Sequence, residues 1–240
     1  QLELKGVEVK LGTLASADTL ADFDEVVLAT GVSPRTPAIQ GIDHPSVVSY
    51  LYVLQKVVPV GRRVALIGAG GIGYDLAEFV GDADHDDPEP PRMEDFARNW
   101  GIDLELSGRG GLEGATPQPE PLAREILQLQ RQASKPGKGL GYTTGWIHRL
   151  SLRKRGVHML AGVEYRRIDD AGLHIVHDGE DKILPVANAV ICAGQEPRRD
   201  LVEPLQAAGR VVHLIGGADV AAELDAKRAI KQGTELAARI

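Results

Sequence analysis

The 240-residue sequence predicts an α/β fold built around a parallel sheet. Its apolar runs are short and continuous and are rich in Val, Leu and Ile, which is typical of strands buried on both faces of such a sheet. Helical stretches separate several of these runs, as the strand–helix alternation of a doubly wound architecture requires. One of the runs also leads directly into a G-x-G-x-x-G turn.

The predicted elements follow one another along the whole chain. Strands are expected at 25–29, 63–67, 126–130, 157–160, 189–192 and 211–215, and helices at 74–80 and 144–155. A hairpin is expected over 172–184 because Asp178-Gly179 favours the positive φ angles of a two-residue turn. Segments rich in acids, prolines and glycines place a long insertion near 81–121, between a helix and the next strand.

Charge and cysteine content exclude several classes of function. The formal net charge of -7 argues against nucleic acid or an anionic membrane surface as a partner. Cys192 is the only cysteine, so the chain by itself forms no four-cysteine cluster site, no four-cysteine zinc site and no redox-active CxxC pair. Because no apolar run approaches the ~18 residues of a membrane span and no signal pattern precedes it, the cytoplasm is the expected location.

The glycine turn after strand 63–67 is the strongest motif for binding a ligand. Gly68 permits the tight turn, Gly70 lets the backbone approach a pyrophosphate, and Gly73 lets the helix pack on the strand. The helix N-terminus then offers unpaired N–H groups to the phosphates. The residues expected to line the pyrophosphate are Gly68, Ala69, Gly70, Gly71, Ile72 and Gly73. The alternative is a glycine-rich turn that binds nothing.

The residues after strand 126–130 indicate which nucleotide is bound. An NAD-specific site has an acid here for the ribose hydroxyl, whereas this sequence has Arg131 and Lys135 and no acid. These cations suit a 2′-phosphate and favour NADPH, the alternative being a basic surface that faces only solvent. Gly194 and Gln195 end a later strand at the same sheet edge and are further candidates for contact with NADPH.

Four features in a fixed order carry a resemblance to a known family. They are the Ala-Thr-Gly strand in FDEVVLATG, the internal glycine turn, a second strand in NAVICAGQEPR and the terminal VVHLIGGAD followed by a helix. This order resembles the flavoproteins with two dinucleotide-binding domains. The runs LIGAGGIGYD, QRQASKPGKGLGYTTGWIHR and HLIGGADVAAELDAKRAI are similar to the C-terminal FAD/NADPH half of the bacterial NADPH-dependent 2,4-dienoyl-CoA reductases, which are related to trimethylamine dehydrogenase. The resemblance covers nearly the whole chain.

The resemblance implies a Rossmann-like NAD(P)-binding domain inserted in a partial FAD-binding domain of the disulfide-reductase type. We expect part of the FAD domain at 1–57, the NAD(P)H domain at 58–187 and the FAD return segment at 188–240, with the first βαβ unit missing upstream. In that family NADPH reduces FAD, and electrons pass through a [4Fe–4S] cluster to FMN, which reduces a dienoyl thioester in the β-oxidation of unsaturated fatty acids. FMN and the cluster belong to an N-terminal part, which would be this chain's partner.

The resemblance also implies the flavin-binding residues. Thr30 and Gly31 end the Ala-Thr-Gly strand, and Gly217 and Asp219 would lie beside the ribityl and phosphate groups of FAD. The helix from about Ala226 would point its N-terminus toward the flavin ring. No residue is expected to act as a catalytic acid or base or to bind a metal, because hydride transfer depends on how the cofactors are positioned. The alternatives are the same half of a related enoate reductase or amine dehydrogenase, and a non-catalytic nucleotide-binding module.

Overall fold

The computed structural model describes residues 1–82, 92–222 and 225–240, and its chain divides into two units. Unit 1 comprises Gln1–Arg35 and Gln195–Ile240, and unit 2 is the intervening Thr36–Gly194. One unit is thus inserted in the sequence of the other. Unit 2 extends beyond the predicted NAD(P)H domain of 58–187 at both ends, because strands at 47–49 and 188–191 also belong to its sheet.

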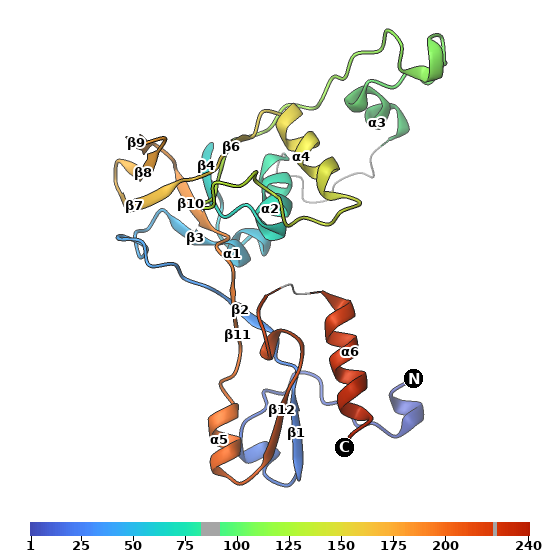
Figure 1. Cartoon of the computed structure of the whole chain (residues 1–240), viewed down its shortest axis with the longest axis vertical. Coiled ribbons are helices and arrows are strands. Elements are labelled where there is room, and N and C mark those ends of the chain that lie inside the picture. Colours follow the sequence, from blue (N-terminus) through green and yellow to red (C-terminus); the bar gives the residue numbers. More distant parts are fainter. Residues whose placement is uncertain (83–91, 223–224) are drawn as a thin grey trace. The chain divides into compact units, whose positions relative to one another are not determined.

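Unit 2 is built on a five-stranded parallel sheet in the order β3-β10-β4-β5-β6 (Figure 1). Its strands are β3 (Val47–Ser49), β10 (Asn188–Ile191), β4 (Arg63–Ile67), β5 (Glu125–Leu129) and β6 (His158–Leu160). Its helices are α1 (Tyr50–Leu54), α2 (Gly71–Gly81), α3 (Met93–Trp100) and α4 (Gly145–Lys154). A separate antiparallel sheet consists of β7 (Glu164–Asp169), β8 (Gly172–His177) and β9 (Glu180–Leu184).

The side chains of the central strands alternate between two cores. In β4, Val64 and Leu66 pack against α1, α2 and α4, whereas Ala65 and Ile67 pack against the antiparallel sheet. All four are essentially inaccessible to solvent, which explains why this strand is continuously apolar in the sequence. Helices α1, α2 and α4 therefore cover one face of the parallel sheet, and the antiparallel sheet covers the other.

The predicted hairpin is confirmed by the backbone. Asp178 and Gly179 join β8 to β9 and have φ angles of 55° and 77°, as a two-residue turn of this kind requires. Strand β7 pairs with β8 across a register shift and has no local pattern in the sequence that predicts it. The Ile168 N–H also donates to the Gln40 carbonyl at 2.9 Å, which ties β7 to the segment before β3.

The described residues of unit 1 form two small sheets, two α-helices and short 3-10 turns. The strands are β1 (Glu25–Leu28) with β12 (Val211–Leu214), which are parallel, and β2 (Val32–Pro34) with β11 (Gln195–Pro197), which are antiparallel. The helices are α5 (Val202–Ala207) and α6 (Ala226–Ala237). Val26 and Leu28 pack with Leu205 of α5, whereas Glu25 and Val27 are exposed. The prediction that every strand is buried on both faces is therefore wrong for β1.

The predicted insertion separates α2 from β5. Helix α2 ends at Gly81 and β5 begins at Glu125, and α3, which was not predicted, lies between them. Part of the insertion, 83–91, lies outside the described residues. Within the described ranges, no helix is long and apolar enough to cross a membrane.

Candidate functional site

The glycine turn lies where the strand order of the unit 2 sheet reverses. From β4 the sheet extends through β5 to β6 on one side and through β10 to β3 on the other. The Cys192 N–H donates to the Ile67 carbonyl at 2.9 Å, so the residues that follow β4 and β10 meet at this point. Ligands of open α/β sheets bind in the crevice at the carboxyl ends of the strands, at such a reversal.

Two of the three glycines are required by the packing of the chain itself. Gly68 has a φ of 130°, and a Cβ on it would lie 2.3 Å from the carbonyl oxygen of Cys192. A Cβ on Gly73 would lie 2.2 Å from the carbonyl oxygen of Gly68. Any side chain at either position would displace backbone, which matches the roles predicted for the first and third glycines.

The packing of the chain gives no such reason for the second glycine. Gly70 caps α2 with a φ of -87° and a ψ of -172°, a conformation that other residues also adopt. No atom lies within 4 Å of a Cβ built on Gly70 or on Gly71, so the space in front of the helix is open. Ala69 and Ile72 pack their side chains against the core and present only backbone to this space. This open helix N-terminus fits a pyrophosphate.

The loop after β5 is ordered by its own polar groups. The Gln130 side-chain amide donates to the carbonyl of Gln132 at 2.9 Å and also to that of Ser134. Arg131 and Lys135 are exposed, and neither forms an ion pair with any residue in the described ranges. Arg131 and Lys135 are therefore free cations on this loop, and no acid lies at the end of the second Rossmann strand.

Gly194 and Gln195 belong to different units. Gly194 has a φ of 96° and is the last residue of unit 2, three positions after the end of β10. Gln195 begins β11 of unit 1, where it pairs with Pro34. Only Gly194 thus shares a unit with the glycine turn.

Sequence reasoning missed Gln128, which is buried beneath the turn. It is fully buried in β5, its amide nitrogen lies 3.3 Å from the position of a Gly73 Cβ, and neither of its amide atoms has a hydrogen-bond partner. A Gln inside the apolar run ILQLQ was the available signal. Cys192 also lies at this edge, and burial raises the pKa of its thiol to about 12, which keeps it protonated.

In unit 1 the structure brings three of the predicted flavin residues together. The Thr30 hydroxyl donates to the Arg198 carbonyl at 2.6 Å, and the Arg198 N–H donates to the Gly31 carbonyl at 3.1 Å. A Cβ on Gly217 would lie 3.1 Å from the carbonyl carbon of Gly31. Gly217 therefore allows a close backbone approach beside the end of the Ala-Thr-Gly segment.

Asp219 and the start of α6 form a second part of this region. Asp219 accepts from the side-chain amide of Gln232 at 2.7 Å and borders a hollow of about 790 Å³ that β12 and α6 also line. Helix α6 begins at Ala226, as predicted. The Asp225 carboxylate accepts from the Arg228 N–H at 2.6 Å, so one donor of this helix terminus is already used within the chain.

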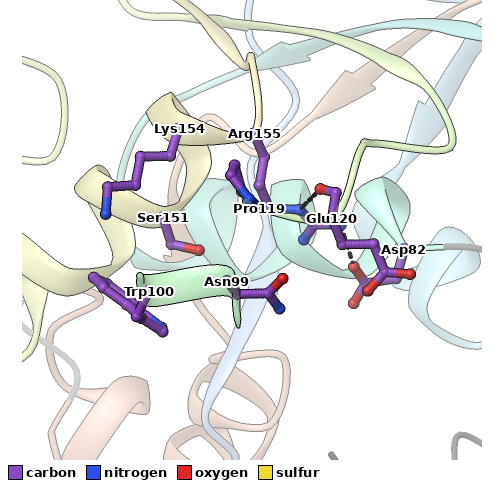
Figure 2. A pocket seen from close by; sticks show the side chains of 8 residues that line it. All are labelled: Asp82, Asn99, Trp100, Pro119, Glu120, Ser151, Lys154 and Arg155. Atoms are coloured by element: carbon purple, nitrogen blue, oxygen red, sulfur yellow. Dashed lines mark hydrogen bonds and ion pairs between the residues drawn. The ribbon is translucent and has the colours of Figure 1, made fainter. Parts of the chain in front are cut away.

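A second hollow, of about 220 Å³, lies between α3 and α4 in unit 2 (Figure 2). Arg155 extends into it and binds the Asp82 carboxylate at 2.7 Å and the Glu120 carbonyl at 3.2 Å. The Lys154 ammonium lies 4.7 Å from the centre of the Trp100 ring. Since these cations already contact groups of the chain, the hollow lacks the free cations of the loop after β5.

Comparison with known proteins establishes the family. The sequence pattern of the pyridine nucleotide-disulphide oxidoreductases matches residues 2–224. The chain belongs to this family. The predicted fold class is thereby confirmed, and the chain is an FAD- and NAD(P)-binding domain of a flavoprotein oxidoreductase.

Individual relatives are much longer than this chain. The metal reductase of Desulforamulus reducens is 24% identical over 89% of the chain and 31% of its own length. The cinnamate reductase of Clostridium sporogenes is 46% identical over 31% of the chain and 11% of its own length. A 2-naphthoyl-CoA reductase structure with bound 2-naphthoyl-CoA covers the whole chain at 23% identity and a TM-score of 0.74, and the match spans 30% of that protein. The chain therefore spans about a third of such proteins.

Proposed function

We propose that the chain is the NADPH-oxidising, FAD-reducing part of a larger flavin reductase that acts on an unsaturated carboxylic acid or its CoA thioester. The observation that carries the proposal is the pair of free cations, Arg131 and Lys135, on the acid-free loop that follows β5. The relatives named cinnamate reductase and 2-naphthoyl-CoA reductase support the substrate class. The motifs similar to the 2,4-dienoyl-CoA reductases favour a 2,4-dienoyl-CoA within that class.

The groups that would hold NADPH lie along the carboxyl edge of the sheet. The N–H groups of Gly70 and Gly71 at the start of α2 would receive the pyrophosphate, where the structure leaves open space. Arg131 would bind the 2′-phosphate through its forked guanidinium, and Lys135 would act as a point charge. When bound, NADPH supplies a hydride and FAD accepts it. The chain contributes the orientation of the two cofactors.

The flavin would lie against unit 1. Thr30, Gly31 and Gly217 form one close backbone region that suits the ribityl and phosphate portion, and Asp219 lies beyond it at the hollow near α6. Further electron carriers, FMN and a [4Fe–4S] cluster, would belong to the rest of the larger protein, since this chain has one cysteine.

An amine dehydrogenase is the second candidate. The structures of an amine oxidase acting on 6-hydroxypseudooxynicotine and of a histamine dehydrogenase match the fold with TM-scores of 0.71 and 0.67. The basic loop favours the reductase, because that loop is suited to NADPH as the electron donor.

In the complete protein, NADPH oxidation is expected to depend on an added enoyl or dienoyl thioester. Turnover with an amine substrate and none with a thioester would overturn the assignment.

The nucleotide assignment is tested by calorimetric titration of the chain with NADPH and with NADH. NADPH should bind at least about tenfold more tightly, a gap of ~1.4 kcal/mol. The double variant Arg131→Ala/Lys135→Ala should erase that gap and leave NADH binding unchanged. The control Arg166→Ala/Lys182→Ala removes the same charges from the antiparallel sheet, where both groups form exposed ion pairs, and should keep the preference. A double variant that retains the preference would refute the assignment.

A further inference from the structure

The turn that carries Lys135 is fixed by contacts with both helices that flank it in unit 2. The Gly137 carbonyl accepts from the Arg149 guanidinium of α4 at 2.8 Å. Gly137 has a φ of 72°, and a Cβ on it would lie 2.8 Å from the Tyr74 ring of α2. The Lys138 N–H donates to the Lys135 carbonyl at 3.1 Å and closes the turn. The turn is thus enclosed at Gly137 by α2 and α4 and closed on itself at Lys135.

Helix α4 is itself fastened to α2 next to this contact. His148 Nδ1 lies 2.9 Å from a carboxylate oxygen of Glu78. Tyr74 is fully buried one position after the last glycine of the nucleotide turn, and the phenol lies 3.5 Å from the sulfur of Met159. Arg149 therefore lies on a helix that is bonded to α2, the helix that begins at the glycine turn.

We propose that Arg149 is a positioning residue for the choice of NADPH over NADH. By holding the turn 135–138, Arg149 would keep Lys135 where its ammonium can reach the 2′-phosphate together with Arg131. Arg149 itself would not touch the nucleotide. The inference rests on the proposed function. It also assigns a purpose to the run QRQASKPGKGLGYTTGWIHR, whose first part supplies the two cations and whose last residue supplies the arginine that orients one of them.

A purely electrostatic role for Arg149 is the competing explanation, because any nearby cation attracts a phosphate. Arg153 provides the control for it. Arg153 lies one turn further along α4 and is exposed, and its charge, like that of Arg149, acts to lower the pKa of Tyr74, although burial raises that pKa overall. Within the described residues, Arg153 forms no hydrogen bond to the 135–138 turn. Removing it takes away a similar charge but leaves the turn attached.

The test compares Arg149→Met with Arg153→Met in the full chain, using the Kd of NADPH and of NADH from calorimetry. Arg149→Met should weaken NADPH binding about five- to tenfold, a loss of ~1–1.4 kcal/mol, and alter NADH binding less than about twofold. Arg149→Lys keeps a donor for the Gly137 carbonyl and should recover part of the preference. Arg153→Met should leave the ratio of the two Kd values unchanged.

Two outcomes would overturn the inference: an unchanged ratio of the two Kd values in Arg149→Met, which includes an equal loss for both nucleotides, or the same change of that ratio in Arg153→Met. If Arg149→Met fails to fold, Gly137→Ala is the substitute test. Its Cβ would meet the Tyr74 ring and displace the turn, so the preference for NADPH over NADH should fall. The Arg131→Ala/Lys135→Ala variant keeps the two proposals distinguishable. If that variant loses the preference and Arg149→Met keeps it, only the positioning role fails. If that variant keeps the preference, the proposed nucleotide site fails as well.

Discussion

A substitution at Gly70, the second glycine of the turn, tests whether this glycine is needed for nucleotide binding and not for folding. Gly70 has ordinary backbone angles and no atom within 4 Å of a Cβ position, so Gly70→Ala introduces no clash. The weaker helix cap and the smaller entropy of the unfolded chain act in opposite directions, which leaves the free energy of unfolding within about 0.5 kcal/mol of the unsubstituted chain. The added methyl group would occupy the path of the pyrophosphate. NADPH affinity should fall at least about tenfold, by ~1.4 kcal/mol.

Gly73→Ala is the matched control within the same turn. Its Cβ would lie 2.2 Å from the Gly68 carbonyl oxygen and 3.3 Å from the Gln128 amide nitrogen, so backbone must move, at a cost of about 1–3 kcal/mol. Urea denaturation measures the free energy of unfolding of both variants, and calorimetry measures NADPH binding. If Gly70→Ala binds NADPH as tightly as the unsubstituted chain, the pyrophosphate does not approach Gly70 and the turn is structural. Destabilisation of Gly70→Ala as severe as that of Gly73→Ala would refute the reasoning about packing.

Three further predictions concern buried or paired polar groups. Gln128→Leu should leave the free energy of unfolding unchanged or raise it by up to about 2 kcal/mol, because neither amide atom has a partner; a clear loss in urea denaturation would contradict this. Arg167 and His174 hold the pKa of Asp169 to about 2, below its usual 3.8, so the stability it contributes is present above pH 3.8 and is lost as the pH falls toward 2. Asp169→Asn should flatten the acid-denaturation profile across that interval, and an unchanged profile would show that the pairing adds nothing. Burial raises the pKa of Cys192 to about 12, so the thiol should react with an alkylating reagent near pH ~8 only after unfolding, and rapid reaction of the folded chain would contradict its burial.

The sequence predicted best those elements whose pattern is local. Strand β4 forms at the predicted residues 63–67, and β5 is displaced by one residue to 125–129. Both strands are buried on two faces, so their apolar runs are continuous and their ends are marked by polar or glycine residues. The hairpin was found because its two turn residues need positive φ angles.

The sequence could not predict features that depend on contacts between distant residues. Strand β3 has three residues and forms through its pairing with β10, in which Val47 lies opposite Ala189. That pairing moves the boundary of the unit from 57 to 35, and nothing in the local pattern indicates it. The glycine turn was predictable because its chemistry follows from spacing. The hydrogen bond from Arg149 to the Gly137 carbonyl could not be predicted, because it joins a helix to a loop and no local pattern marks it.

Unit 2 has more buried apolar side chains than unit 1, and this difference affects how nucleotide binding and flavin binding are interpreted. In unit 2, buried side chains fill both faces of the five-stranded sheet, so the glycine turn and the loop after β5 stand on a rigid base. Among the described residues of unit 1, the main buried cluster is Val26, Leu28 and Leu205 with partly buried side chains packed on it, and each fully buried side chain contributes about 1.5–3 kcal/mol. The nucleotide contacts proposed for Gly70, Gly71, Arg131 and Lys135 all belong to unit 2. Binding of NADPH without binding of FAD would therefore leave the nucleotide assignment intact.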